Sequence, residues 1–172
     1  MKKTQVFVFS GVLIALEVIL TRFLSIQTEI VRYGFGFIPI SMSGMLFGPL
    51  TAGITAVLAD IIGMIIAPRG AYFPGFTISA FVTGFIYGIV LHKRNITILR
   101  TGFAVFLVTL ISDLILTTIW ISMLTGNSVA AIAAARIIKS FIMLPVSTAL
   151  IYIVWNSAGK AIQGRLIASN NK

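Results

Sequence analysis

The feature that most constrains this sequence is a succession of long apolar stretches that carry few charged residues. Six of them run approximately over Gln5–Leu24, Phe35–Phe47, Leu50–Ala67, Gly75–Leu91, Thr101–Leu124 and Val129–Trp155. A helix needs on the order of 20 apolar residues to cross a bilayer, and fewer where neighbouring protein buries it. Hydrocarbon offers backbone N–H and C=O groups no water to bond, and the alternation typical of a barrel is absent. We therefore expect an all-α polytopic membrane protein with six transmembrane helices.

Short turn signals separate these stretches. Gly48-Pro49 divides the second from the third, Pro74-Gly75 opens the fourth, and Thr125 to Asn127 separates the last two. Charged residues make up 10% of the chain, against about 25% in an average soluble protein. We expect residues 1–172 to form a single membrane-embedded domain, without a soluble domain or long linker.

Lysine and arginine are distributed unequally between the connecting segments. One side of the predicted bundle carries Lys2, Lys3, Lys93, Arg94, Arg100, Lys160, Arg165 and Lys172, and the other carries Arg22, Arg32 and Arg69. Positively charged loops stay in the cytoplasm, so both termini are predicted to be cytoplasmic. The segments 25–34 and 68–74 and the turn at Gly126 then lie outside. The net charge of +9 thus reflects membrane topology, and no nucleic-acid partner is expected.

Several kinds of chemistry have no support in the sequence. The chain has no cysteine, which excludes disulfides and thiol nucleophiles. Its one histidine, His92, is predicted at a cytoplasmic helix end beside Lys93 and Arg94, where a catalytic triad or metal site is not expected. Gly159-Lys160 lacks the earlier glycine and the following Ser or Thr of a phosphate loop. We expect no catalytic residue, metal or cofactor, and no ATP hydrolysis.

Ionisable residues inside the predicted spans are the first candidates for function. Each costs roughly 2.5–3.5 kcal/mol to insert, so it needs a partner or a role. They are Glu17, Asp60, Asp113, Arg136 and Lys139. Helical spacing extends two of them into polar stripes, Thr109, Asp113, Thr117 and Trp120 on one helix and Arg136, Ser140, Met143 and Ser147 on the next. Both stripes are predicted to face protein or water.

The sequence pattern favours one role for some of these charged residues and leaves the role of others open. Arg136 and Lys139 lie one turn apart and suit a ligand carboxylate, with a salt bridge to Asp60 as the alternative. For Asp113 and Glu17, pairing that holds helices together and contact with a ligand weigh equally. Small residues are predicted to let helices pack closely at Ala52, Ala56, Ala59 and Gly63, and also at Gly11 and Ala15. The last pair could face inward or outward.

The stretch from Arg32 to Gly88 carries more specific motifs. It contains Gly-Phe-Gly-Phe-Ile-Pro at 34–39, Gly-Met-Leu-Phe-Gly-Pro at 44–49, Ala59-Asp60, and Ala-Tyr-Phe-Pro-Gly-Phe-Thr at 71–77. These segments resemble the substrate-binding (S) components of energy-coupling factor transporters. Pro68, the 70–77 segment, Ser79-Ala80 and Tyr87-Gly88 are similar to the folate-specific subfamily. The resemblance covers about a third of the chain strongly, and the last two helices match in placement alone.

The resemblance implies a bacterial cell-membrane subunit that captures a vitamin at its outer face. It also implies delivery of the vitamin together with a transmembrane coupling protein and two cytosolic ATPases. Gly11 and Ala15 stand where the family has an alanine pair that docks the partner. Folate combines flat rings with carboxylates, so a site needs aromatic faces, cations and an acceptor for pterin donors. The candidate residues are Arg22, Arg32, Asp60, Arg69, Tyr72, Phe73, Phe76, Trp120, Arg136 and Lys139.

Four alternatives stay open from the sequence. The aromatic residues could form an interfacial belt instead of a pocket. The vitamin could be riboflavin, thiamine or pantothenate. The chain could also be a stand-alone secondary transporter, although no inverted repeat is visible, or an assembly subunit without a ligand.

Overall fold

The computed structural model describes residues 3–27, 32–68 and 72–164. In chain order it contains α1 (Lys3–Arg22), the antiparallel pair β1 (Ile26–Gln27) and β2 (Arg32–Tyr33), α2 (Phe37–Phe47), α3 (Pro49–Ile66) and α4 (Pro74–Leu91). A long helix follows, made of α5 (Ile98–Val108), the π-helical η1 (Thr109–Thr117) and α6 (Thr118–Thr125). The last helix comprises α7 (Val129–Val154), the π-helical η2 (Trp155–Gly159) and a further α-helical turn to residue 164.

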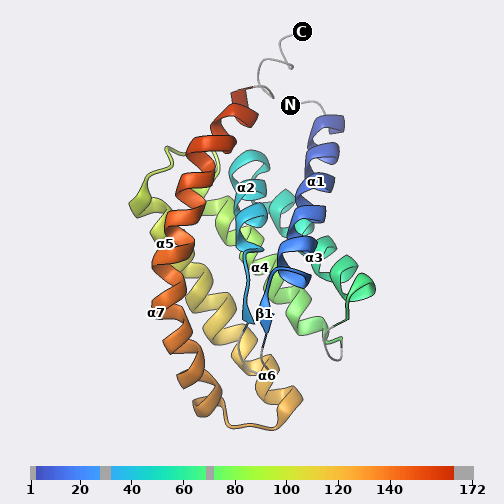
Figure 1. The fold of residues 1–172 in the computed structure, drawn as a ribbon, viewed down its shortest axis with the longest axis vertical. Helices are drawn as coiled ribbons and strands as arrows, with labels where there is room; N and C mark the ends of the chain where they lie inside the picture. Colours follow the sequence, from blue (N-terminus) through green and yellow to red (C-terminus); the bar gives the residue numbers. More distant parts are fainter. Residues whose placement is uncertain (1–2, 28–31, 69–71, 165–172) are drawn as a thin grey trace.

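The expected helical membrane fold is confirmed. Within the described residues five helices are long and apolar enough to cross a membrane, and α2 is a shorter sixth. Both termini lie at one end of the bundle, and the turn between α6 and α7 lies at the other (Figure 1). Apolar side chains from Phe7 on α1 to Phe141 on α7 are exposed on the outer surface, as a lipid-facing surface requires.

Three details of the expected layout are corrected. The segment 25–34, expected as a loop, contains the pair β1 and β2. The fifth helix begins at Ile98 instead of Thr101, because the Thr97 side chain caps it by accepting from the Arg100 backbone N–H. The sixth helix does not end at Trp155, since η2 carries it on to residue 164. A π turn keeps the helix going with wider i to i+5 hydrogen bonds, although Asn156, Ser157 and Gly159 in this segment are residue types typical of a helix end.

Small residues bring α3 and α4 into backbone contact. A Cβ placed on Gly84 would collide with the Ala52 carbonyl, and a Cβ on Gly88 would collide with the backbone of Pro49. Ala52, Ala56 and Ala59 are at most 1% exposed. The alanine stripe on α3 is therefore a packing surface, as expected.

The short helix α2 occupies the inside of the bundle, and its residues 39–46 are all buried. Gly48, with φ of 91°, turns the chain sharply from α2 into α3. Buried apolar residues of α2, α4, α5, α7 and η2 form one cluster that includes Met45, Leu91 and Trp155. In the part of the bundle that lies farther from the termini, the helices around α2 enclose a cavity.

We predict that Gly84→Ala lowers stability by about 1–3 kcal/mol, because the new methyl group meets backbone that cannot move aside. The matched control is Gly102→Ala on α5, where the nearest atom, Thr148 Cγ2, is 3.6 Å away. That change should be neutral or slightly stabilising, since alanine favours helix. Thermal unfolding of the two variants in detergent is the measurement. Equal midpoints would contradict the close approach of α3 and α4.

Candidate ligand-binding site

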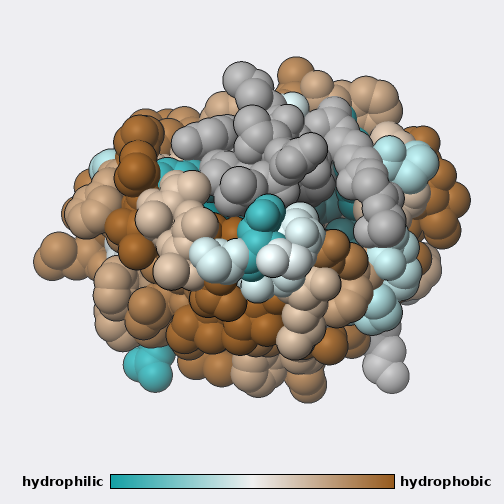
Figure 2. All heavy atoms as spheres, turned by 90° about the horizontal axis from the view of Figure 1, so that it is seen from below, coloured by the Kyte–Doolittle hydropathy of each residue, from teal (hydrophilic) through white to brown (hydrophobic). Residues whose placement is uncertain are grey.

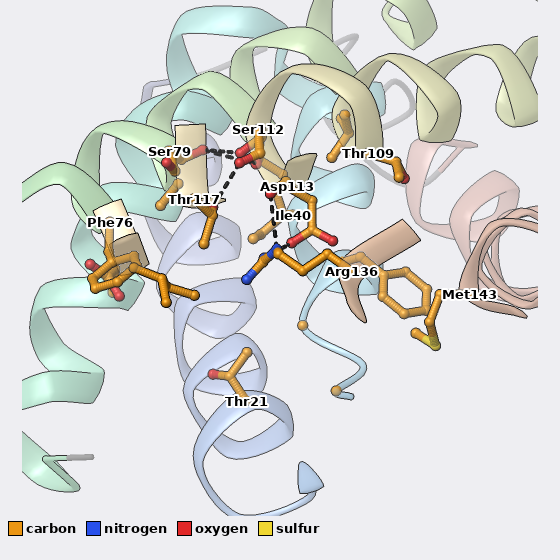
Figure 3. A pocket seen from close by; sticks show the side chains of 18 of the residues that line it. Thr21, Ile40, Phe76, Ser79, Thr109, Ser112, Asp113, Thr117, Arg136 and Met143 are labelled. Atoms are coloured by element: carbon orange, nitrogen blue, oxygen red, sulfur yellow. Dashed lines mark hydrogen bonds and ion pairs between the residues drawn. The ribbon is translucent and has the colours of Figure 1, made fainter. Parts of the chain in front are cut away.

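A cavity of about 480 Å³ lies between the helices, and side chains from α1, α2, α3, α4, η1, α6 and α7 line it (Figure 3). Seven of the ten residues predicted for a ligand site are on its wall, namely Arg22, Asp60, Tyr72, Phe73, Phe76, Arg136 and Lys139. Arg32 belongs to β2, but its side chain lies outside the described part, and Arg69 lies outside the described residues altogether. Residues that are far apart in the sequence thus line the same cavity.

One wall of the cavity carries an ion cluster between η1 and α7. Asp113 accepts from the Arg136 guanidinium through Oδ1 and from Lys139 Nζ through Oδ2 at 2.9 Å. Arg136 Nε also donates to the Asp113 backbone carbonyl at 3.1 Å, and the Arg136 side chain is 4% exposed. Two cations thus share one carboxylate, and the cluster has a net positive charge.

The alternative pairing of Arg136 and Lys139 with Asp60 is wrong. Asp60 lies on α3, which packs against α1, and its carboxylate meets Arg22. Asp113 sits on the segment that faces α7 directly. The stripe Arg136, Ser140, Met143 and Ser147 does line the cavity, as its spacing predicted.

The second ion pair joins α1 to α3. Arg22 Nη2 lies 3.4 Å from Asp60 Oδ1 and donates to the Asp60 carbonyl at 3.3 Å. Gly63 makes room for it, since a Cβ there would stand 2.6 Å from Arg22 Nε. Thr77 Oγ1 donates to Asp60 Oδ2 at 2.9 Å and lies 3.1 Å from Tyr72 Oη. Asp60 is therefore held by α1 and α4 together.

The predicted aromatic residues gather at the start of α4. The rings of Phe73 and Phe76 meet edge to face at 6.0 Å between centroids, and Phe73 lies 5.6 Å from Trp120. Trp120 packs over Gly75 and donates its indole N–H to Ser79 Oγ at 3.1 Å. Trp120 is thus behind the wall, supporting Phe73, and is absent from the described lining residues.

Trp120 ends the polar stripe predicted on the fifth helix, and it faces protein as expected. Thr109, Asp113 and Thr117 line the cavity, as the stripe predicted, but Trp120 does not. Thr117 Oγ1 donates to the Ser112 carbonyl five residues earlier at 2.7 Å. Trp120 contacts Phe73 and Ser79, which both line the cavity, so it borders the cavity without lining it.

A network of hydroxyl groups between α4 and η1 was not predicted. Thr83 Oγ1 donates to Ser112 Oγ at 2.7 Å, and Ser112 Oγ donates to the Ser79 carbonyl at 2.9 Å. All three residues line the cavity. Serine and threonine are common in membrane helices, and their spacing alone did not distinguish these positions from others.

Charge is distributed unevenly around the cavity. Its described lining includes three cations and three carboxyl groups. Arg136 and Lys139 with Asp113 make the η1 and α7 side positive, whereas Asp60 and the buried Glu17 outnumber Arg22 on the other side. Seen from the end of the bundle with the turn between α6 and α7, hydrophilic side chains lie near the middle, and the margin is mostly apolar with hydrophilic groups at a few places (Figure 2). The cavity can therefore orient a ligand that has donors at one end and anionic groups at the other.

Gly11 and Ala15 face away from the bundle. Both are exposed, and a Cβ on Gly11 would have no atom within 4 Å among the described neighbours. Leu13 and Glu17, by contrast, are buried. The small-residue pair on α1 is thus on the outer surface, which answers the question that the sequence left open.

Comparison with known proteins identifies the chain. Residues 5–155 match the sequence profile described as "ECF transporter, substrate-specific component". The chain belongs to this family. It is therefore a multi-pass cell-membrane protein of a transport system, as the resemblance implied.

Named relatives extend the comparison to the whole length. The chain is 45% identical over 172 residues, all of both proteins, to "Folate transporter FolT" of Clostridium novyi (strain NT). It is 33% identical over 160 residues to a protein of the same name from Leuconostoc mesenteroides, covering 90% of this chain and 86% of that one. A solved structure described as "Crystal structure of FolT bound with folic acid" matches with a TM-score of 0.82 and 38% identity, over 88% of this chain and 91% of the other.

We predict that Asp60→Asn destabilises the ligand-free protein by about 1.5–3 kcal/mol, because the guanidinium of Arg22, 3% exposed, loses a hydrogen bond to a charged carboxylate. The double variant Arg22→Met/Asp60→Asn should regain part of that loss, since it no longer buries a guanidinium. Unfolding in detergent of both single variants and the double variant measures the coupling between the two positions. Strictly additive losses would contradict a stabilising role for the pair.

Proposed function

We propose that this S component binds folate or a reduced folate, one molecule per chain, in the cavity between α1, α3, α4, η1 and α7. What carries the proposal is the 45% identity, over the full length, to a protein named as a folate transporter. The likeness to a structure bound with folic acid supports it further. Residues 1–172 would then serve as one substrate-binding domain.

The residues of the cavity suit the parts of this ligand. Phe73 and Phe76 offer aromatic faces to the pterin and benzoyl rings. Asp60 accepts from pterin N–H groups on the side where carboxylates are in excess. Arg136 and Lys139 receive a carboxylate of the glutamate tail on the positive side. Arg32 and Arg69 are proposed as further cations of the site, and Tyr72 and Trp120 as its aromatic supports.

We propose that the protein works in a complex and not alone. Its termini face the cytoplasm, in accord with the unequal loop charges, so the cavity takes folate from outside. Gly11 and Ala15 form a flat surface on α1 for a transmembrane coupling protein, and two cytosolic ATPases supply the energy. The chain itself hydrolyses nothing in this scheme.

The first test is direct binding. Calorimetry with purified protein should give tight binding of folate with a stoichiometry of one. Riboflavin, thiamine and pantothenate should give no heat, because none combines a pterin with a glutamate. Binding of one of those vitamins in place of folate would contradict the proposed specificity but would not affect the family assignment.

The charge roles predict how variants discriminate between ligands. Arg136→Gln and Lys139→Gln should each lower the affinity for folate by roughly 30-fold to several thousand-fold, which is equivalent to about 2–5 kcal/mol of binding free energy. The same variants should bind bare pteroate, which lacks the glutamate, nearly as the wild type does. Arg100→Gln, outside the cavity lining, is the control and should leave both affinities unchanged.

If the affinities for folate and pteroate fell equally in these variants, Arg136 and Lys139 would have a structural role and would not bind the ligand carboxylate. The pair would then serve to hold η1 against α7 through Asp113.

The outward face of α1 predicts a separation of binding from transport. Gly11→Leu/Ala15→Leu should leave folate binding by the isolated protein unchanged, because both positions face away from the cavity. Uptake by the assembled complex in proteoliposomes should fall to background. Unchanged uptake would show that another surface docks the partner.

A further inference from the structure

A second pocket lies at the end of the bundle that carries the termini. It has a volume of about 330 Å³ and is lined by residues of α2, α4, the segment 92–97, η2 and the turn after it. These residues are Met45, Leu91, Lys93, Arg94, Asn95, Ile96, Trp155, Lys160 and Gln163. The ligand cavity shares none of them.

The pocket combines an apolar floor with a basic rim. Met45, Leu91 and Trp155 are buried, whereas Lys93, Arg94 and Lys160 are exposed. The chain has four acidic residues, Glu17, Glu29, Asp60 and Asp113, and none of them is among the described residues that line this pocket. Three cations therefore face one space without a carboxylate beside them, in contrast to the cations of the ligand cavity.

The backbone around these cations is held in place. His92 Nδ1 lies 3.2 Å from the Met45 carbonyl, which ties the end of α4 to α2. Lys93 takes a φ of 53°, and Arg100 Nη1 donates to the Asn95 carbonyl at 3.3 Å. On the other side, the Trp155 ring lies over Gly159 where a Cβ would otherwise be, and Lys160 follows at once. The rim is thus built from two hydrogen-bonded or packed turns.

Exposed apolar residues flank the pocket-lining segments in the sequence. Ile98 and Leu99, next in sequence to the basic segment, are 55% and 84% exposed, and Ile153, just before Trp155, is 59% exposed. In a membrane protein such residues face acyl chains. A phosphate held by the three cations would therefore be bound by segments whose neighbouring residues are exposed and apolar.

We propose that this pocket binds the phosphate headgroup of an anionic phospholipid. The cations pair with the phosphate, and the acyl chains lie along the exposed apolar residues beside the pocket. Each lysine or arginine near an anionic lipid surface is worth roughly a fivefold enrichment. The site is separate from the folate proposal and does not depend on it.

Trp155 provides the probe, since the chain has two tryptophans and Trp120→Phe leaves it alone. That variant is placed in phosphatidylcholine vesicles with an equal fraction of brominated phosphatidylglycerol or brominated phosphatidylcholine. Quenching of Trp155 by the anionic lipid should be at least about twofold greater. The preference should shrink as salt rises, because the cations are exposed.

Lys93→Gln/Arg94→Gln/Lys160→Gln in the same background should abolish the preference. Lys2→Gln/Lys3→Gln/Lys172→Gln, which removes equal charge from the chain ends, should retain it. Equal thermal midpoints of the two triple variants establish that both are folded. The salt response of the unmodified pocket tests the proposal even if the first variant does not fold.

Three results would overturn the proposal. One is no preference for the anionic lipid. A second is loss of the preference on adding inorganic phosphate at matched ionic strength, which would make this a site for a soluble anion. The third is an unchanged lipid preference in the first triple variant together with loss of uptake by the assembled complex when the same three substitutions are made with Trp120 retained, which would make the cluster a contact for the partner proteins.

Discussion

Every charged side chain inside this bundle must pair or hydrogen-bond with another group of the protein, because the lipid outside cannot solvate it. Arg22, Asp60, Asp113, Arg136 and Lys139 all turn inward for that reason, and all line one cavity. The same ion pairs that join α1 to α3 and η1 to α7 thereby give the cavity its polarity. Stability and recognition rest here on shared side chains, so the two cannot be altered independently.

Hydropathy was enough to predict six helices, and spacing was enough to predict the face of α7 that carries Arg136 and Ser140. Both depend on regular α-helix and on the contrast between lipid and protein, which a single sequence records. The small residues of α3 were predictable on the same ground, since close packing needs them.

Features that depend on facing elements could not be predicted. Asp113 was not chosen over Asp60 as the partner of Arg136, because sequence does not tell which helix lies opposite which. The π-helical turn η2 left no distinct pattern, so the predicted end of the last helix at Trp155 was wrong. The hydroxyl network of Ser79, Thr83 and Ser112 exists only once α4 and η1 meet.

Helix α1 carries Glu17 and Arg22 on the side toward the cavity and Gly11 and Ala15 on the side toward the membrane. No break interrupts it between Lys3 and Arg22. The same continuous helix therefore supplies charged residues to the cavity wall and a small-residue face to the outer surface. The two faces share one backbone, so a change in the position of α1 alters both together.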